Sequence, residues 1–246
     1  MTLIWQGSKA LFAIPDYKLP NISQIVEAFF RQTPQGPTWW ILLYNAAYTA
    51  LEAVTGFTIG AVVGFLFAVL FIQAPFARRG LMPFVIASQT IPIIAIAPAI
   101  VVGLGRLGAP PWVSKSAIAA YLTFFPVTIN SLRGLEAVSQ DALLLMKSYA
   151  ATNNQIFWKL RLPNSAPYVF TALKISATAS VIGAIIGELP VGSKYGIGVQ
   201  IVIGSQYNTF NPGYLWATII TAAILGILFY GAVALVERRV VKWRRE

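Results

Sequence analysis

Long apolar stretches separated by short charged segments dominate the hydrophobic pattern of this chain. Uncharged runs cover 53–77, 80–105 and 116–132, and each is long enough for one bilayer-spanning helix of about 20 residues. A fourth apolar segment is interrupted by Lys174 and reaches Glu188, and a fifth occupies the last part of the chain. The pattern predicts an all-α, polytopic membrane helix bundle with five full spans, at roughly 43–72, 82–105, 113–132, 166–189 and 213–236.

The second predicted span is the least regular. It contains Pro83, Pro92 and Pro98, and each proline removes one backbone N–H donor. Three polar residues stand beside the middle proline: Ser88, Gln89 and Thr90. Carbonyl groups released inside a membrane must bond to a neighbouring helix or line a wet cavity. This span is therefore a candidate for the wall of a translocation path, with Ser88, Gln89, Thr90 and Pro92 as its lining residues.

Other polar residues in the predicted spans are further candidates for the same path. They are Thr128, Asn130, Ser176, Ser180 and Glu188. Ser and Thr hydroxyls also bond back to their own helix, so packing and lining both remain open for them. Glu188, at the end of the fourth span, is either a functional or paired group or an interfacial residue near Lys194.

Three glycines follow one another at four-residue spacing in the first predicted span: Gly56, Gly60 and Gly64. Lipid gives helices no hydrophobic reason to associate, so small residues at this spacing are typical of close helix packing in membranes. We interpret these glycines as a packing surface.

The first 40 residues form a segment of a different kind. Asn21 is a suitable N-cap for a helix whose apolar residues recur at Ile22, Ile25, Val26 and Phe29. Because this helix is too short to span a bilayer, the prediction for 1–40 is an extracytoplasmic, interfacial segment. Residues 195–211 are too polar for a further span and are not predicted to be helical.

The composition narrows the class of protein. The chain is 57% hydrophobic and 11% charged, whereas soluble domains carry about 25% charged residues. It has no His and no Cys, so we expect no catalytic residue and no metal site. The net charge of +10 would favour a nucleic-acid partner for a soluble domain, but a membrane protein acquires the same surplus from basic cytoplasmic loops, so no nucleic-acid partner is expected.

The basic residues predict the orientation. They concentrate in three segments that five spans put on one side: Arg78 and Arg79; Arg133, Lys147, Lys159 and Arg161; Arg238, Arg239, Lys242, Arg244 and Arg245. Basic loops remain in the cytoplasm. We expect a multi-pass protein of the prokaryotic cytoplasmic, or inner, membrane with a cytoplasmic C-terminus.

One cytoplasmic loop, 136–165, has an unusual composition. It is predicted to contain a helix, a break at 152–154 and a short amphipathic helix that Pro163 ends. Ile156, Phe157, Trp158 and Leu160 are expected to be exposed there. Because a soluble loop does not normally expose such residues, a groove on a partner protein is their predicted destination.

This loop resembles the EAA motif of binding-protein-dependent ABC importer permeases, which reads Glu-Ala-Ala, three residues, Gly, nine residues, Ile, one residue, Leu-Pro. Aligning Leu162 and Pro163 with the final Leu-Pro places Leu160 at the Ile and Ala150 at the Gly, with Ala151 next to it. The Glu-Ala-Ala positions are then occupied by Leu145, Met146 and Lys147. With the glycine absent, Asn153 or Asn154 is expected to supply a left-handed turn conformation.

The resemblance covers about residues 15–240 and is to the nitrate, sulfonate and taurine type of permease, which includes riboflavin and pyrimidine-precursor importers. It is carried by Leu19-Pro20-Asn21-Ile22-Ser23, by the proline-containing stretch 89–98, and by Glu188 with Gly196-Ile197-Gly198. It implies a type I importer permease fold over 41–246, with 136–165 as the coupling loop. Members usually have six spans, and Thr2 to Trp5 resembles the tail of a first span, so the expectation is either a native start upstream of Met1 or a short member of the family.

The resemblance also implies a function and a set of partners. The chain would be the permease subunit of an importer, translocating a small solute that an extracytoplasmic binding protein delivers. Two cytoplasmic ATPase subunits would bind the coupling loops of two permease copies. The two permease copies are expected to be identical and to form a homodimer. The chain has no Walker A sequence, so ATP and Mg would belong to the ATPase, and this chain would hold no cofactor and be no enzyme.

The charged and aromatic residues of the spans bear on the class of substrate. Lys115 and Lys174 are the cations inside the predicted spans, and each lies close to a span end, so a fixed anion site is not evident. The aromatic content favours riboflavin or a similar heteroaromatic vitamin or precursor, with sulfonate, taurine or nitrate as the other possibilities. An ion-coupled secondary transporter is the alternative function, for which Glu52 and Glu188 are the candidate ion-binding carboxylates, and a membrane enzyme is a more distant one.

Overall fold

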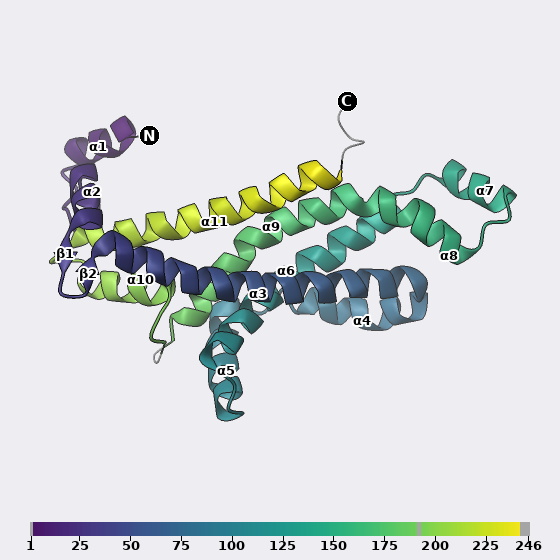
Figure 1. Ribbon diagram of the computed structural model, residues 1–246, viewed down its shortest axis with the longest axis horizontal. Coiled ribbons are helices and arrows are strands. Elements are labelled where there is room, and N and C mark those ends of the chain that lie inside the picture. The colour runs from purple at the N-terminus through teal and green to yellow at the C-terminus, as the bar shows by residue number, and fades with distance from the viewer. Residues whose placement is uncertain (1, 191–192, 242–246) are drawn as a thin grey trace.

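The computed structural model describes residues 2–190 and 193–241, and helices make up most of it. Its longest helices run along one axis of an elongated bundle (Figure 1). The N-terminal segment and α10 lie at one end, and α7 and α8 lie at the other. The basic residues Lys242, Arg244 and Arg245 lie outside the described residues.

The element bounds are as follows. The first part of the chain contains α1 (Thr2–Leu11), α2 (Ile22–Phe30), the short antiparallel strands β1 (Gln32–Thr33) and β2 (Gly36–Pro37), α3 (Thr38–Gln73) and α4 (Pro75–Ala87). The middle contains α5 (Ile93–Arg106), α6 (Pro111–Glu136), α7 (Gln140–Ser148), α8 (Asn153–Ile156) and a π-helical turn at Phe157–Arg161. The last part contains α9 (Leu162–Glu188), α10 (Ile197–Gln206) and α11 (Pro212–Val240).

Three helical stretches in the described residues are long and apolar enough to cross a membrane. They are Thr38–Gln73, Asn153–Glu188 and Pro212–Val240. They correspond to the first, fourth and fifth predicted spans, and they confirm the all-α membrane fold. α3 has 36 residues, so it is about 54 Å long and exceeds a hydrocarbon core of about 30 Å.

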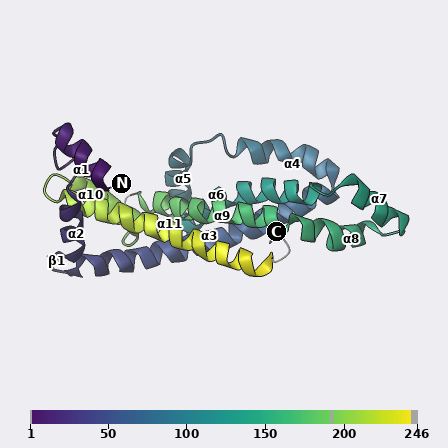
Figure 2. The ribbon, with the colours of Figure 1, turned by 90° about the horizontal axis from the view of Figure 1, so that it is seen from above.

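The prediction of one continuous helix over 82–105 is wrong. α4 ends at Ala87 and α5 begins at Ile93, and α5 then runs across the long axis of the bundle (Figures 1 and 2). Pro92 explains the break, because proline lacks the N–H that a continuing helix needs and disfavours helical geometry in the residue before it. The Tyr121 hydroxyl, on α6, donates a hydrogen bond to the Ser88 carbonyl at this turn.

α6 lies at the centre of the bundle, where it packs against both α3 and α9. The three glycines of α3 face it. A Cβ added to Gly60 would lie 2.7 Å from the Thr123 Cβ and 3.0 Å from the Ala120 Cα, and one on Gly64 would lie 3.1 Å from the Val127 Cβ. The two helix backbones approach this closely only because the glycines carry no side chain.

The N-terminal segment packs on the end of the bundle. The Asn21 N–H donates to the Gln24 Oε1 at 2.8 Å, so α2 begins at its predicted cap. Ile25 and Ala28 are buried against Leu42 of α3 and Ala217 of α11. Part of the apolar face of α2, from which a membrane-surface position was predicted, therefore contacts protein.

A polar contact holds the loop between α1 and α2. Asp16 accepts hydrogen bonds from the Lys9 Nζ at 2.5 Å and from the Gln24 Nε2 at 2.8 Å. These two donors, Lys9 first, lower the pKa of the exposed Asp16 carboxyl below its ordinary value.

α10 is a helix that the sequence analysis missed. It occupies part of the segment predicted to be non-helical, and Ile197, Gly198, Gln200 and Gly204 are buried along it. Its start is stabilised by side chains from distant parts of the chain, described below.

Candidate functional site

The end of the molecule that carries α7 and α8 contains the predicted coupling loop. The Ser139 hydroxyl accepts the Ala142 N–H at 3.3 Å and begins α7. Thr152 begins α8, where its N–H donates to the Gln155 Oε1 at 2.8 Å and its hydroxyl accepts the Gln155 N–H at 3.3 Å. Two capped short helices therefore form a defined elbow that projects beyond the bundle (Figure 1).

Ala150 forms the turn between these two helices. Its φ is +54°, in the left-handed region. Its N–H donates to the Lys147 carbonyl at 2.9 Å, and the Ala151 N–H donates to the Met146 carbonyl at 3.0 Å. This pair of bonds is the Schellman arrangement that glycine usually supplies at a helix C-terminus. The prediction that Asn153 or Asn154 takes the left-handed conformation is wrong, because both are in α8.

The apolar residues of the elbow divide into two sets. Phe157 is 8% exposed and packs against Phe71, Leu132 and Leu135, and Ile156 is also buried. The expectation that both are exposed is wrong, because successive residues of a helix point about 100° apart and one side of this helix faces the bundle. The exposed set is Leu144, Leu145, Tyr149 and Trp158.

The remaining residues of the predicted coupling site lie around this set. Lys147, Ala150 and Pro163 are exposed, and Met146, Ala151, Leu160 and Leu162 are partly buried. Pro163 does not end the short helix as predicted. The chain continues from α8 through the π-helical turn into α9, where Pro163 lies in the first turn, a position that tolerates a missing N–H.

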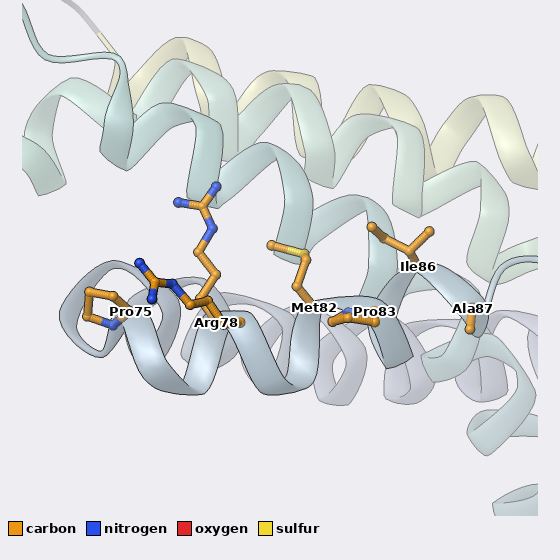
Figure 3. Close-up of a pocket in the computed structure, with 7 residues that line it drawn as sticks. Pro75, Arg78, Met82, Pro83, Ile86 and Ala87 are labelled. Carbon is orange, nitrogen blue, oxygen red and sulfur yellow. The ribbon is translucent and has the colours of Figure 1, made fainter.

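Two hollows lie in this part of the molecule, and one of them borders the elbow. One, of about 480 Å³, lies between the end of α3 and the elbow and includes Gln73, Lys147, Asn153 and Arg161 among its lining residues. The other, of about 770 Å³, lies along α4, where Met82 and Ile86 project on one side of the helix (Figure 3). Arg78 and Arg79 line the second hollow, and Arg78 also pairs with Glu136 of α6.

The candidate path residues fall into a buried and an accessible group. Thr128, Ser176 and Ser180 are fully buried. The Thr128 and Ser180 hydroxyls bond back to their own helices, at 2.8 and 2.9 Å, and Ser176 donates to the Thr123 carbonyl of α6 at 3.4 Å. Asn130 donates to its own helix at the Pro126 carbonyl, at 2.8 Å. The described hydrogen bonds of these four polar groups thus stay within α6 and α9.

The accessible group lies at the break between α4 and α5. Gln89, Thr90 and Pro92 are exposed and Ser88 is half-buried. The structure therefore brings these four together on one turn and separates them from the buried polar residues of α6 and α9.

Glu188 is buried, with 1% of its surface exposed. Its carboxylate accepts the Thr49 hydroxyl at 2.7 Å and the Gly198 N–H at 2.6 Å. The alternative of an interfacial residue near Lys194 is therefore wrong. Gly196 has a φ of +124° and a Cβ there would overlap the Glu188 carboxylate, so the glutamate and the Gly-Ile-Gly sequence form one structural unit.

Two residues of α3 complete this unit, and the sequence analysis missed both. The Asn45 Oδ1 accepts the Gly196 N–H at 2.8 Å, and the Thr49 Oγ1 accepts the Ile197 N–H at 2.8 Å. Three side chains from two other helices thus satisfy the N–H groups at the start of α10, where an anionic group is also favoured by the helix dipole. We call Asn45, Thr49 and Glu188 the α10 cap.

A buried ion pair lies beside the cap. Lys115 of α6 approaches the Glu52 Oε1 of α3 at 2.9 Å, and their side chains are 7% and 3% exposed. Lys115 lies at the start of the predicted third span, and the structure buries it as the partner of Glu52. The spacing of Asn45, Thr49 and Glu52 puts all three on one face of α3, a signal from which the buried polar cluster could have been predicted.

The opposite end of the bundle from the elbow contains a cavity of about 820 Å³, which we call the outer cavity. It lies between the strands, the start of α3, α10 and the start of α11 (Figure 1). Its aromatic lining residues are Trp40, Tyr44, Tyr195, Tyr207, Phe210 and Tyr214. Its polar lining includes Asn45, Gln200 and Asn211, with Arg31 and Lys194 as cations.

The chain is similar to proteins of known class. Residues 56–242 match the family described as "Binding-protein-dependent transport system inner membrane component". The formylaminopyrimidine transport permease protein ThiX of Halalkalibacterium halodurans is 31% identical, across 100% of this chain and 93% of the relative. The riboflavin transport system permease protein RibX of Chloroflexus aurantiacus is 24% identical, across 99% of this chain and 87% of the relative.

The fold has solved counterparts. A chain of the MetNI methionine ABC transporter, in an inward-facing conformation, superposes with a TM-score of 0.59 and 23% identity, covering 82% of this chain and 97% of its own length. These similarities confirm the permease fold predicted from the sequence. The relatives are permease subunits and not enzymes. The chain belongs to the family of binding-protein-dependent transport system inner membrane components and is the permease component of an ABC importer.

Proposed function

We propose that this chain forms, with a second identical copy, the path through which an importer moves a small heteroaromatic solute, and that two ATPase subunits drive it from the α7–α8 elbow. The observation that carries this proposal is the elbow itself. It is well ordered by capping hydrogen bonds, yet it exposes Leu145, Tyr149 and Trp158 at 57%, 76% and 60%. A rigid, apolar projection of this kind is suited to a groove on a partner protein.

The charge distribution supports a cytoplasmic position for the elbow. The described basic residues of the three basic segments lie in α4, at the end of α6, in the elbow and at the end of α11, all towards one end of the bundle (Figure 1). The positive-inside rule assigns that end to the cytoplasm, with the C-terminus. The segment 1–40 and the outer cavity then face the side from which a binding protein delivers solute.

The packing of the bundle supports a mechanical role. α9 continues directly from the elbow and packs along α6, which in turn packs against the glycines of α3. Closely packed helices move as a unit, so a displacement of the elbow is transmitted to the far end of α9. Glu188 and the α10 cap lie at that far end, so ATP binding and hydrolysis in the partner would rearrange the outer end while this chain breaks no bond. ATP and Mg would be held by the ATPase alone.

The lean towards a heteroaromatic substrate is supported by two relatives whose names specify formylaminopyrimidine and riboflavin. Other relatives are named for aliphatic sulfonates and nitrate, which are small anions. The aromatic lining of the outer cavity favours the first group, because a flat ring stacks on aromatic side chains and a small inorganic anion does not.

The proposal is tested by purifying the tagged chain from detergent-solubilised membranes and identifying the proteins that accompany it. Recovery of an ATPase, together with a binding protein whose ligand is then measured, is the expected result. Uptake of that ligand should stop when the ATPase carries a hydrolysis-inactivating substitution. If the chain purifies without an ATPase and transports in liposomes driven by an ion gradient, the function is that of a secondary transporter and the proposal is wrong.

A further inference from the structure

We infer that the outer cavity is a binding site on the permease itself for a planar heteroaromatic molecule that is neutral or anionic. This inference rests on the proposed function, and it adds a site, its recognition groups and a charge preference. Its volume of about 820 Å³ is within the range of small-molecule sites, about 300–1,000 Å³.

The aromatic walls come from four parts of the chain and include a ring that is held in position. Tyr195 stacks on Tyr48 with a centroid distance of 4.9 Å and an interplanar angle of 22°. Tyr44 contacts the same ring edge-on at 5.7 Å. Tyr195 nevertheless remains 44% exposed, and Trp40 is 52% exposed. Rings that are fixed by their neighbours and still accessible stack on a planar ligand at a small entropic cost.

Gln200 supplies the polar group that a merely apolar hollow would lack. It lines the cavity, yet it is only 8% exposed. Its Oε1 accepts the Tyr214 hydroxyl at 2.5 Å, which orients the amide. Its Nε2 makes no hydrogen bond to the described residues. This atom remains accessible to solvent. A fixed, nearly buried N–H₂ donor is thus available in the cavity, where it suits a ring nitrogen or a ring carbonyl oxygen.

The charged groups around the cavity set the charge preference. Arg31 and Lys194 both line it, and none of the described residues that line it is acidic. The local potential therefore favours a neutral or anionic ligand and opposes a cationic one.

A belt of aromatic residues at the membrane surface would also expose Trp and Tyr. Such a belt does not explain the amide of Gln200. This amide is nearly buried, Tyr214 orients it, and its N–H₂ group faces the cavity without a partner from the described residues. The Gln200 Nε2 opens onto the cavity, so its hydrogen-bond acceptor comes from outside the described protein, as water or as a ligand that displaces the water.

The test uses the complete transporter in lipid nanodiscs with no binding protein present, and riboflavin as a fluorescent planar probe. Its binding is measured by fluorescence anisotropy, with flavin mononucleotide as an anionic competitor, thiamine as a cationic competitor and taurine as a non-aromatic anion. Riboflavin and flavin mononucleotide should bind, and thiamine and taurine should not compete. Tyr195→Ala and Gln200→Leu should each weaken riboflavin binding about tenfold or more. Tyr230→Ala, on the exposed surface of α11, is the matched control and should bind as the parent does.

Each other outcome has a definite meaning. Riboflavin binding that is unchanged in both Tyr195→Ala and Gln200→Leu, or that thiamine abolishes, overturns the site. No riboflavin binding, together with loss of binding-protein docking in the same variants, assigns this face to a protein partner and also overturns it. If Gln200→Leu fails to fold, Gln200→Glu replaces it: the carboxylate keeps the acceptor for Tyr214 and loses the donor, so weakened binding is again expected. Specific riboflavin binding in a chain that recruits no ATPase would leave the site standing while the importer proposal fails.

Discussion

The Glu188 carboxylate on α9 accepts a hydrogen bond from the Thr49 hydroxyl on α3 at 2.7 Å, although the two residues are separated by most of the chain. The same carboxylate accepts the Gly198 N–H, so one buried side chain connects α3, α9 and α10. This contact places the start of α10 against the core and gives the outer cavity a fixed wall, because Gln200 follows within the first turn of that helix.

Replacing Glu188 with Ala should destabilise the protein by about 1–3 kcal/mol, since it leaves the buried Gly198 N–H without its acceptor and the Thr49 hydroxyl with only the Asn45 carbonyl, at 3.2 Å. Glu188→Gln should have a smaller effect, because the amide oxygen still serves one of the two donors. The measurement is the apparent melting temperature in detergent. Glu237→Gln is the control: Glu237 pairs with Lys174 and both side chains are 21% exposed, so its loss should cost less than about 1 kcal/mol. Equal melting temperatures for Glu188→Ala and Glu237→Gln would contradict the cap.

Replacing Gly60 with Ala should force α3 away from α6 and lower stability by about 1–3 kcal/mol, because the new methyl group meets backbone and Cβ atoms that cannot move independently. Gly226→Ala on α11 is the matched variant, since a Cβ there has no neighbour within 4 Å. It should be neutral or should stabilise the helix by up to about 1 kcal/mol. Comparing the two melting temperatures checks the prediction, and a neutral Gly60→Ala would show that the helices are less closely packed.

Replacing Trp158 with Asp should reduce ATPase copurification and transport while membrane insertion and melting temperature stay unchanged, because this ring is exposed at the elbow. Trp158→Phe should restore much of the association. Phe157→Asp should instead destabilise the cytoplasmic end, since it would put a charge among Phe71, Leu132 and Leu135. Undiminished copurification and uptake in Trp158→Asp would remove this ring from the docking surface.

Replacing Ala150 with Gly should stabilise the elbow by about 1–2 kcal/mol, because a residue with a Cβ is strained at a φ of +54° and glycine is not. Ala142→Gly, inside α7, should have the opposite effect, about 1 kcal/mol of destabilisation. Amide hydrogen exchange of residues 140–152 distinguishes the two variants. Equal or faster exchange in Ala150→Gly would contradict a strained turn at this position.

Several features of the site could be predicted from the sequence. The apolar runs predicted α3, α9 and α11, because a helix that crosses a membrane needs about 20 mostly apolar residues in succession. Such long apolar runs are rare in other structures. The degenerate loop motif pointed to the elbow, and its alignment placed Ala150 at the glycine position, where the structure has a left-handed residue. These predictions depend only on local geometry and on the solvent that surrounds each helix.

Other features depended on contacts between distant residues. Phe157 and Trp158 are adjacent and both aromatic, and only the position of α3 and α6 determines which of them is buried. The prolines marked 82–105 as irregular, but the sequence analysis still placed one span there, and the direction that α5 takes after Pro92 follows from packing that no local pattern describes.

By itself, the sequence determined that the chain is a helical membrane protein with an EAA-like loop, because solvent transfer and helix periodicity act on residues that are close in the chain. The tertiary structure alone decided that Glu188, Thr49 and Asn45 cap α10, that Lys115 pairs with Glu52, and that aromatic residues from four segments enclose one cavity. The physical reason is that a buried polar group must find a partner wherever the fold brings one within hydrogen-bonding distance, and that partner is set by how helices pack and not by its place in the sequence.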